Sequence, residues 1–412
     1  MPEISSIRGR LVYNSRGSKT IEVDVISDKK HLGRACAPSG ASVGKYEAQS
    51  FAGNKPESSL QVLNKNLNKF VGLKSDDLKS IQRELRKIDN TSNYSKIGGA
   101  VAYALTIASV DSAAKSLGEP MFKIISQTKK WKFPFPLGNI LGGGAHAGPG
   151  TPDIQEILIC AIGAKSVRDA IETNLAVHKE LGKTLQKNDP RFTNGRGDEG
   201  GWAPEMDNER ALEISAQACE NLGYTLGKEV ALGVDFASST QWDEKKKKYI
   251  YERAGFENTP QEQIDFAAEI IKKYKLIYAE DAVHEEAFSD MAELAKKFPK
   301  TLIVGDDLTV TNAKILKKAI SKKACNAAIL KVNQAGSLYD ALEFARVATK
   351  NKIRLITSHR SGESTDYQIS HIGIATGSKM LKVGVVGGER VAKLNELIRL
   401  SEHNLIHGMA EI

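Results

Sequence analysis

Apolar and polar residues alternate in the first part of the chain. Residues 21–25 read Ile-Glu-Val-Asp-Val, and this period of two predicts a strand with one buried face. The Asn-Ser-Arg-Gly segment at 14–17 predicts a hairpin turn before that strand, because Asn and Gly tolerate positive φ. A second short strand is expected at 34–37, followed by helical patterns as far as about Leu117. This part of the chain is therefore expected to form an α+β domain.

The second part of the chain repeats one pattern, in which a short apolar run ends in a charged or polar residue. Such runs precede, in order, Asp235, Glu280, Asp306, Lys331 and His359. The last four of these residues follow one another at intervals of 26, 25 and 28 residues, and amphipathic helical patterns fill the gaps. A strand with its crossover helix takes up about 30 residues, so the pattern predicts consecutive βα units.

Continuous apolar strands of this kind are typical of a (β/α)8 barrel, whose active site lies at the carboxyl ends of the strands. A doubly wound sheet is disfavoured, because the Gly-Gly-Gly run at 142–144 does not extend into GxGxxG with a later acidic ribose ligand. The Phe-Pro-Phe-Pro segment at 133–136 breaks any helix and marks a domain boundary. We therefore expect an α/β chain in which a smaller α+β N-terminal capping domain (1–130) precedes a (β/α)8-type barrel (131–412).

Composition limits the class of protein more than its partners. The chain has 412 residues, of which 41% are hydrophobic and 26% charged, as expected of a globular protein rather than a disordered one. Its net charge of +8 is mild for this length. The four cysteines stand far apart, the first residues lack the apolar core of a signal peptide, and no apolar stretch is long enough to span a bilayer. We expect a cytoplasmic protein without membrane association.

Three carboxylates, those of Asp235, Glu280 and Asp306, end three successive strands of the predicted barrel. Such strand ends converge on one mouth, where like charges repel one another unless a cation lies between them. Ligands that are all oxygen atoms favour a hard ion such as Mg²⁺ over zinc. Any one of these carboxylates is as well explained as a helix cap. Three in register favour a metal site.

Two basic segments follow the carboxylates. Burial of Lys331 behind a strand, with a metal nearby, is expected to lower its pKa and make it a usable base. The alternative is a structural ion pair with Asp306 or Asp307. The Ser-His-Arg-Ser segment at 358–361 offers hydroxyl, imidazole and guanidinium groups, which suit a bound phosphate.

Glycine-rich segments mark further candidate residues. Residues 197–201 place Glu199 among three glycines, which suits an acid that must approach a ligand closely. His146 lies within Gly-Gly-Gly-Ala-His-Ala-Gly at 142–148, and Glu156 ends another short extended run. Taken alone, His146 is better explained as a structural histidine.

With these motifs in place, the chain resembles the enolase family, the phosphopyruvate hydratases, over nearly its whole length. The resemblance is carried by residues 37–44 (APSGASVG), 142–148, 155–156, 197–204 (GDEGGWAP), 305–312 (GDDLTVTN), 330–336 (LKVNQAG) and 358–363 (SHRSGE). It implies a lyase of glycolysis and gluconeogenesis that dehydrates 2-phosphoglycerate reversibly to phosphoenolpyruvate. It also implies a cytoplasmic homodimer or higher homo-oligomer, whose partner is a small anionic phosphorylated substrate.

The resemblance further implies two Mg²⁺ sites. Asp235, Glu280 and Asp306 would bind the tighter ion. Ser39, in the loop at 37–44 that is similar to the family's mobile substrate loop, would help to hold a second ion that arrives with the substrate.

The resemblance assigns the catalytic roles as well. Lys331 would be the base that removes the proton next to the substrate carboxylate. Glu199, with Glu156 beside it, would be the acid that protonates the departing C3 hydroxyl. The residues that would contact the substrate are His146, Glu156, Glu280, Asp306, Ser358, His359, Arg360, Ser361 and Lys382.

The family's late Lys-Thr-Gly-Ala-Pro segment is altered in this chain. Ungapped counting from Ser361 leads to Lys382, in Lys-Val-Gly, as the lysine that meets the substrate carboxylate. Lys379 is close enough in sequence to compete for that role.

Two other functions stay open. A barrel relative that acts on another carboxylate acid, as a racemase or dehydratase, would keep the metal carboxylates but would not need the Ser39 loop or the Arg360-Ser361 pair. An enolase-like binding protein with weakened catalysis would fit the charge of +8 and the altered Lys382 segment. The four lysines at 245–248 lack an aromatic stacking pattern and predict a solvated hairpin tip, so nucleic acid is not expected as a partner.

Overall fold

The N-terminal domain is built on a three-stranded antiparallel sheet, as the alternating pattern predicts. The computed structural model describes residues 1–41, 44–126, 128 and 130–412. The sheet has the order β1 (Ile4–Tyr13), β2 (Lys19–Ser27), β3 (His31–Cys36). Ile21, Val23 and Val25 are fully buried on one face of β2, and Gly17, with φ of 68°, lies in the predicted turn between β1 and β2. The alternation of apolar and polar residues therefore predicts the buried face of β2 correctly.

Helix α3 joins the two domains. The helices of the N-terminal domain are α1 (Pro56–Asn66), α2 (Leu78–Ile88), α3 (Gly99–Leu117) and α4 (Met121–Ile125), with two short 3-10 turns, η1 (Ala52–Asn54) and η2 (Leu67–Lys69). Residues 99–114 of α3 are all buried, because the helix is covered from both domains. Strands β2 and β3 pack against it from the N-terminal domain, and α10 (Val332–Ala335) and α11 (Leu338–Lys350) pack against it from the barrel domain. A helix that is apolar all round is typical of such a sandwiched position. Across the described ranges, no helix combines the length and the apolar character needed to cross a membrane.

The second domain is a closed eight-stranded barrel, which confirms the predicted fold class. Around the barrel the strands follow the order β11-β12-β13-β14-β15-β5-β6-β7. Their bounds are β5 (Phe135–Gly142), β6 (Glu156–Cys160), β7 (Ala231–Asp235), β11 (Tyr278–Glu280), β12 (Leu302–Gly305), β13 (Ala327–Leu330), β14 (Arg354–Ser358) and β15 (Met380–Lys382). The residues predicted from the repeating pattern all lie at or just beyond the carboxyl ends of their strands.

One strand, β6, runs antiparallel to both of its neighbours, β5 and β7, which the βα repeat does not predict. Between β5 and β6 the chain forms a loop with one 3-10 turn, η3 (Gly144–His146), in place of a crossover helix, and an antiparallel pair needs no crossover. Because β6 is reversed, its first residue lies at the same mouth as the last residues of the parallel strands. Glu156 is therefore paired in register with Asp235.

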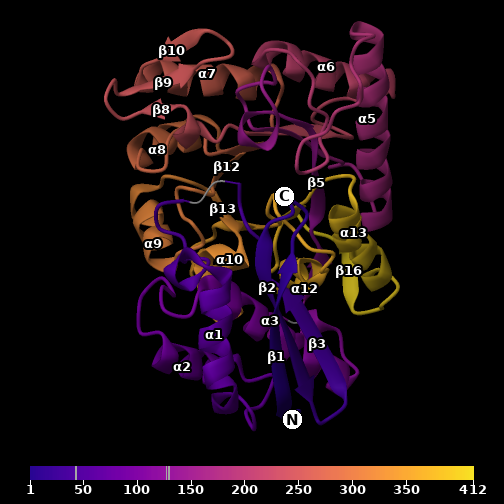
Figure 1. The fold of residues 1–412 in the computed structure, drawn as a ribbon. Coiled ribbons are helices and arrows are strands. Elements are labelled where there is room, and N and C mark those ends of the chain that lie inside the picture. Colours follow the sequence, from indigo (N-terminus) through magenta and orange to yellow (C-terminus); the bar gives the residue numbers. More distant parts are fainter. Residues whose placement is uncertain (42–43, 127, 129) are drawn as a thin grey trace.

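Helices surround the barrel and cover its outer face (Figure 1). They are α5 (Val167–Asn188), α6 (Asn208–Asn221), α7 (Pro260–Lys273), α8 (Phe288–Lys297), α9 (Ala313–Lys322), α11, α12 (Gln368–Ala375) and α13 (Gly388–Leu400). The remaining elements are β4 (Trp131–Phe133), η4 (Ser238–Thr240), β8 (Trp242–Asp243), β9 (Lys248–Tyr251), β10 (Phe256–Asn258) and β16 (Ile406–Met409). Strands β8 and β9 form an antiparallel pair, and the lysine run at 245–248 lies at its turn, as expected.

The N-terminal domain contacts the barrel beside its mouth. In Figure 1 it lies below the barrel, and its strands point towards it. Beyond β3, the backbone amide and carbonyl of Ser39 each bond to Gly362 over 2.8 Å, and the amide of Ala48 donates to the carbonyl of Gln334 over 2.8 Å. Ser39 and Ala48 are thereby bonded to the loop that follows β14 and to helix α10, which follows β13. Ser42 and Val43, which belong to the predicted substrate loop, lie outside the described residues.

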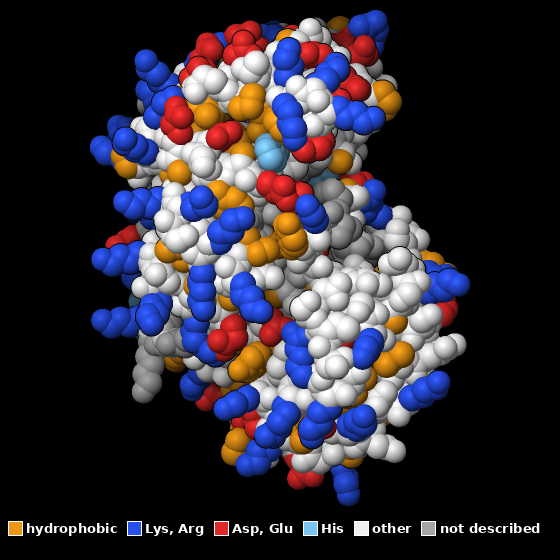
Figure 2. Space-filling model, turned by 90° about the vertical axis from the view of Figure 1, so that its left-hand side faces the viewer, with side chains coloured by type: hydrophobic (Ala, Val, Ile, Leu, Met, Phe, Trp, Pro, Cys, Tyr) orange, Lys and Arg blue, Asp and Glu red, His pale blue; other side chains and the backbone are white. Residues whose placement is uncertain are grey.

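Basic side chains are dispersed over the surface. Lys and Arg occur across the whole face shown in Figure 2, where they are interspersed with Asp and Glu rather than gathered in one patch. The surplus of positive charge is therefore a general property of this face and does not mark a single anion-binding surface on it.

Candidate active site

The mouth of the barrel brings together the charged residues predicted from the strand ends. Asp235, Glu280 and Lys382 are the last residues of β7, β11 and β15, whereas Asp306 and Lys331 directly follow β12 and β13. Buried charges are costly unless they are paired, and the exposed fractions of Asp235, Glu280, Asp306 and Lys382 are 4%, 0%, 7% and 2%. Each of them forms an ion pair with another charged residue of the mouth.

Lys382 lies among three carboxylates. Its ammonium nitrogen is 2.6 Å from Oε2 of Glu280, 2.9 Å from Oδ2 of Asp235 and 3.3 Å from Oε1 of Glu156. These carboxylates raise the pKa of Lys382 well above its ordinary value against the opposing effect of burial. Lys379 precedes β15 and is bonded through its backbone to Leu355 and Phe135. Of the two competing lysines, only Lys382 is part of the cluster.

Lys331 is paired with the metal-ligand candidate Asp306. Burial lowers the pKa of Lys331, but the neighbouring carboxylate of Asp306 raises it, and the net shift is upward. The expectation of a lowered pKa is therefore wrong for this arrangement, because burial brings the lysine into contact with an opposite charge. The structural ion pair, which the sequence left open as an alternative, is present.

The carboxylates fit a hard divalent cation. Ligand atoms of Glu280, Asp281 and Asp306 lie within 4.8 Å of one another, and all three residues are buried. Oε2 of Glu280 accepts hydrogen bonds from Tyr278 and Lys382, while its Oε1 is buried without a hydrogen-bond partner among the described residues. Burial, followed by the charge of Asp235, raises the pKa of Glu280 well above its ordinary value. A cation would satisfy both the unpartnered oxygen and the crowded charge.

Asp281 is a member of this cluster that the sequence did not single out. Its two carboxylate oxygens accept the backbone N–H groups of Asp306, over 3.0 Å, and Asp307, over 2.8 Å. The residue has φ of 43°, in the left-handed region, and these two bonds hold it there. Asp281 thus fixes the start of the loop after β12, where Asp306 is located.

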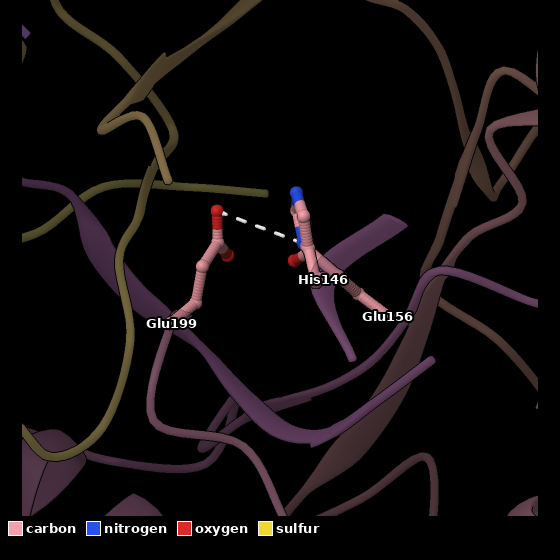
Figure 3. Close-up of side chains that lie close together, drawn as sticks. All are labelled: His146, Glu156 and Glu199. Atoms are coloured by element: carbon pink, nitrogen blue, oxygen red, sulfur yellow. Dashed lines mark ion pairs between the residues drawn. The ribbon is translucent and has the colours of Figure 1, made fainter. Parts of the chain in front are cut away.

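A second group of titratable side chains in the site comes from three different parts of the fold (Figure 3). His146 comes from η3, Glu156 from the start of β6 and Glu199 from the glycine-rich loop at 197–201. Nδ1 of His146 is 3.3 Å from Oε1 of Glu156 and 3.8 Å from Oε1 of Glu199, so the imidazole contacts both carboxyl groups. Nδ1 of His146 and Oε2 of Glu156 have no hydrogen-bond partner in the described structure. Both residues line the cavity described below, where a polar ligand could supply the missing hydrogen bonds.

The pKa values of the two glutamates move in opposite directions. Burial, followed by the charge of Glu199, raises the pKa of Glu156. Burial also tends to raise the pKa of Glu199. His359, which is hydrogen-bonded to Glu199, and His146 lower it by more, so the pKa of Glu199 lies well below its ordinary value. Between the two, the pKa of His146 is raised because the carboxylates outweigh its burial. A proton in this group is therefore held on the side of Glu156 and His146.

The segment 358–361 contributes three further polar groups. Nε2 of His359 is 3.1 Å from Oε2 of Glu199. The Arg360 guanidinium pairs with the buried carboxylate of Glu47, with Nη1 3.0 Å from Oε2. Oγ of Ser361 is buried without a hydrogen-bond partner among the described residues, whereas Ser358 donates to the backbone of His359. Arg360 and Ser361 thus present a cationic and a hydroxyl group to the site.

The residues form a cavity of about 30 Å³, and Lys331 and Lys382 are among the groups that line it. Of the loop at 37–44, the cavity lining includes Gly40 and Ala41 but not Ser39, within the part of the loop that the structure describes. The hydroxyl of Ser39 instead accepts a hydrogen bond from Nδ2 of Asn14 over 2.8 Å. Ser39 is therefore the one predicted site residue that this arrangement does not bring to the carboxylates.

Sequence reasoning missed several residues that hold the site together. Besides Asp281, these are Gln155, Gln334, Glu47 and Arg390. Gln155 Nε2 donates to Asp235 over 3.2 Å, and Gln334 Nε2 donates to Asp306 over 3.0 Å. Both lie within quoted motifs, at 155–156 and 330–336, and their membership of these motifs was the available signal. Glu47 and Arg390 lie outside the motifs and carried no such signal.

The comparisons with known proteins agree with this geometry. The chain matches the family models described as "Enolase, N-terminal domain" over residues 4–125 and "Enolase, C-terminal TIM barrel domain" over residues 130–409. It is 44% identical over 411 residues to "Enolase" from Methanosphaera stadtmanae and 42% identical over 411 residues to "Enolase" from Methanothermobacter thermautotrophicus, covering 99% of both chains in each case. It is 39% identical to "Enolase" from Pyrobaculum aerophilum, covering 97% of both chains.

Proposed function

The chain belongs to the enolase family, and we propose that Lys331 and Glu199 transfer the protons of the reversible dehydration of 2-phosphoglycerate to phosphoenolpyruvate. The activity is that of a hydro-lyase acting on a phosphorylated carboxylate. The observation that supports the residue roles is a single one. Lys331 and Glu199 line one buried cavity but contact different groups, Asp306 and His359 respectively.

The reaction makes two opposite demands on the protein. The proton at C2 lies next to an ionised carboxylate, so its removal accumulates negative charge, while the C3 hydroxyl leaves only if it is protonated. A base and an acid that act on different atoms of one substrate must therefore stand apart, with cationic groups around the carboxylate. In this chain Lys331 would be the base, and Lys382 supplies a cationic group for the substrate carboxylate.

The family uses Mg²⁺, and we assign the tighter ion to Asp235, Glu280 and Asp306. Bound Mg²⁺ would stabilise the charge that develops on the substrate carboxylate as the C2 proton leaves. A Lys or His base combined with one or two such ions is general in the enolase superfamily. For the second ion we propose Ser39, whose hydroxyl would have to leave Asn14 and approach the cavity.

Glu199 must act as an acid in dehydration and as a base in the reverse hydration. Its lowered pKa favours the carboxylate, which is the form that hydration requires. For dehydration the proton has to be supplied, and Glu156 and His146, both with raised pKa, hold it nearby. The two glutamates therefore act as a coupled pair, and the acid role belongs to the pair with Glu199 nearest to His359.

The anionic ends of the substrate match the cationic side chains of the site. Arg360 and Ser361 suit the phosphate group, because a guanidinium fork and a hydroxyl donate to its oxygens. Lys382 suits the carboxylate, and His146 and His359, which both contact Glu199, would lie at the leaving hydroxyl. Ser358 supports this segment through its bond to the backbone of His359.

The experiment that tests these roles separates the two proton transfers. In D₂O, Lys331→Ala should lose both exchange of the C2 proton and formation of phosphoenolpyruvate, each by roughly 10²- to 10⁴-fold. Glu199→Gln should retain C2 exchange while phosphoenolpyruvate formation falls by a similar factor. Lys379→Ala, outside the cluster, is the matched control for removal of a lysine. Wild-type turnover in Lys331→Ala would refute the assignment of the base.

The remaining assignments concern the domain boundary, the oligomeric state, the location and nucleic acid. We infer a domain boundary at 130/131, which the matched segments 4–125 and 130–409 support. From the resemblance to the family we also infer a homo-oligomer that works in the cytoplasm. Size-exclusion chromatography with light scattering tests the oligomeric state, and a monomer would contradict it. Nucleic acid is not expected to bind at physiological salt, because the basic residues on the face shown in Figure 2 are dispersed.

A further inference from the structure

Arg390 is a completely buried arginine in the first turn of α13. Its Nη1 is 2.7 Å from Nδ1 of His359 and 2.6 Å from the carbonyl oxygen of Arg360. Its Nη2 is 2.6 Å from the carbonyl oxygen of Ser361 and 2.9 Å from that of Asp198. One guanidinium group therefore connects the loop after β14 with the loop that carries Glu199.

The contact with His359 determines where the proton on its imidazole lies. A guanidinium group can only donate hydrogen bonds, so Nδ1 of His359 must accept one and carries no hydrogen. In the neutral ring the hydrogen then resides on Nε2, and this nitrogen is 3.1 Å from Oε2 of Glu199. The chain of donors thus runs in one direction, from Arg390 through His359 to Glu199.

We propose that Arg390 is a positioning residue that holds His359 in the neutral, Nε2-protonated tautomer and fixes the segment 359–361 relative to Glu199. Its effect on turnover rests on the proposed role of Glu199, whereas the tautomer of His359 does not. Arg390 touches no group that reacts, and it acts through His359 and three backbone carbonyls.

Electrostatics around His359 support the neutral ring. Burial and the positive charge of Arg390 lower the pKa of His359 to about 4, although the carboxylates of Glu199 and Glu363 act in the opposite sense. Near neutral pH, His359 therefore presents a fixed N–H donor to Glu199 and not a second exchangeable charge.

The arrangement requires arginine rather than a positive charge alone. The guanidinium fork reaches four acceptors in two loops, while a lysine ammonium group has three donors on one nitrogen and cannot span them. The Nε of Arg390 lies 3.3 Å from a carboxylate oxygen of Glu389 in the same turn, which partly offsets the buried charge. A lysine at this position would keep the charge and lose the geometry.

Nuclear magnetic resonance of protein labelled with ¹⁵N in its imidazole rings tests the proposal without reference to activity. In the wild type, long-range ¹H–¹⁵N correlations between pH 6 and 8 should show His359 with Nε2 protonated and Nδ1 unprotonated, the signals being assigned by their absence in His359→Gln. In Arg390→Gln, the two tautomers should mix and the imidazole should titrate at higher pH. Arg399→Gln, at an exposed arginine of the same helix, is the control and should leave His359 unchanged.

Turnover and a conservative variant complete the test. Arg390→Gln should lower kcat by about 10- to 100-fold with a smaller change in KM, as expected when a reacting group is misplaced. Arg390→Lys should also lower kcat but keep the titration of His359 near that of the wild type, and it serves if Arg390→Gln does not fold. A wild-type His359 protonated at Nδ1, or His359 signals unchanged in Arg390→Gln, would overturn the proposal. If the wild type showed the expected tautomer of His359 but did not convert 2-phosphoglycerate, the proposed function alone would be refuted.

Discussion

The ammonium nitrogen of Lys382 lies 2.6 Å from Oε2 of Glu280, although 102 residues separate them in the chain. Asp235 and Glu156 complete the surroundings of this nitrogen. A single positive charge thus lies among three carboxylates that are proposed to bind metal or to hold protons. The contact links the stability of the barrel mouth to the charges that occupy it.

Lys382→Met should destabilise the protein and weaken substrate binding. Removal of one partner from a buried charge pair costs about 3–5 kcal/mol, so the melting temperature in a chelating buffer should fall. Added Mg²⁺ should raise the melting temperature of this variant more than that of the wild type, because a cation would replace the missing charge. The KM for 2-phosphoglycerate should rise.

Lys379→Met is the matched control for this prediction. Lys379 contacts the barrel through its backbone before β15, so the substitution should change neither KM nor the response to Mg²⁺. If Lys379→Met raised KM while Lys382→Met did not, the assignment of the late lysine would be reversed.

Chelation should abolish turnover, and Mg²⁺ should stabilise the folded protein. A ligand at 100 times its dissociation constant stabilises the state that binds it by about 2.7 kcal/mol. Glu280→Gln and Asp306→Asn should lose most of the increase in melting temperature that Mg²⁺ produces in the wild type. Glu257→Gln, an exposed acidic residue paired with Lys246, should keep it. An undiminished Mg²⁺ response in Glu280→Gln would exclude this residue as a ligand.

The strand ends were predictable because their signal is local. An apolar run that stops at Asp235 or Lys331 indicates both a buried strand and the position of its carboxyl end. The carboxyl ends of the parallel strands of a barrel lie at one mouth. The family motifs then added roles for those residues. The reversed direction of β6 was not visible in the same pattern, since a strand buried on both faces reads alike in either direction.

Contacts across the mouth could not be predicted from local patterns. Glu47 meets Arg360 across 313 positions of sequence, and Arg390 follows an ordinary Gly-Gly-Glu segment at the start of a helix. The pKa of Lys331 was predicted in the wrong direction for the same reason. Burial was foreseeable from the sequence, but the side chain that burial places next to the lysine was not.

Glu47→Gln should destabilise the protein and make it more responsive to phosphate. The carboxylate of Glu47 is the buried partner of Arg360, with Nη1 3.0 Å from Oε2, and loss of such a charge costs about 3 kcal/mol. Inorganic phosphate should raise the melting temperature of this variant more than that of the wild type, since it would restore a negative charge beside the guanidinium group.

Glu286→Gln is a suitable control in the neighbouring contact. Glu286 pairs with Lys45 over 3.0 Å, but both side chains are more than half exposed, and exposed pairs contribute less than about 1 kcal/mol. Its melting temperature and its phosphate response should stay near those of the wild type. Equal phosphate responses in Glu47→Gln and the wild type would contradict the proposed place of the phosphate.

Asp366→Asn should stabilise the protein above pH 6 and have little effect below pH 4. Asp366 accepts the backbone N–H of Cys36 over 2.6 Å at the seam between the domains, and burial raises its pKa from 3.8 to about 6. Below about pH 3 the carboxyl group is protonated in both the folded and the unfolded chain, so it costs no stability. Between pH 4 and 6 the unfolded chain ionises this carboxyl group while the folded protein keeps it protonated, so stability of up to about 3 kcal/mol is lost. Asparagine keeps an acceptor for Cys36 and avoids that loss.

Thermal unfolding at pH 4, 5, 6 and 7 measures this difference, which should grow with pH and level off above 6. Asp24→Asn provides the opposite case. Although burial acts to raise the pKa of Asp24, its bonds to Arg10 and Arg34 lower it to about 2, so its ionised form stabilises the fold throughout pH 4 to 7. Asp24→Asn should therefore destabilise the protein by a constant amount over this range. A difference for Asp366→Asn that is equally constant with pH would show that this carboxyl group does not titrate near 6.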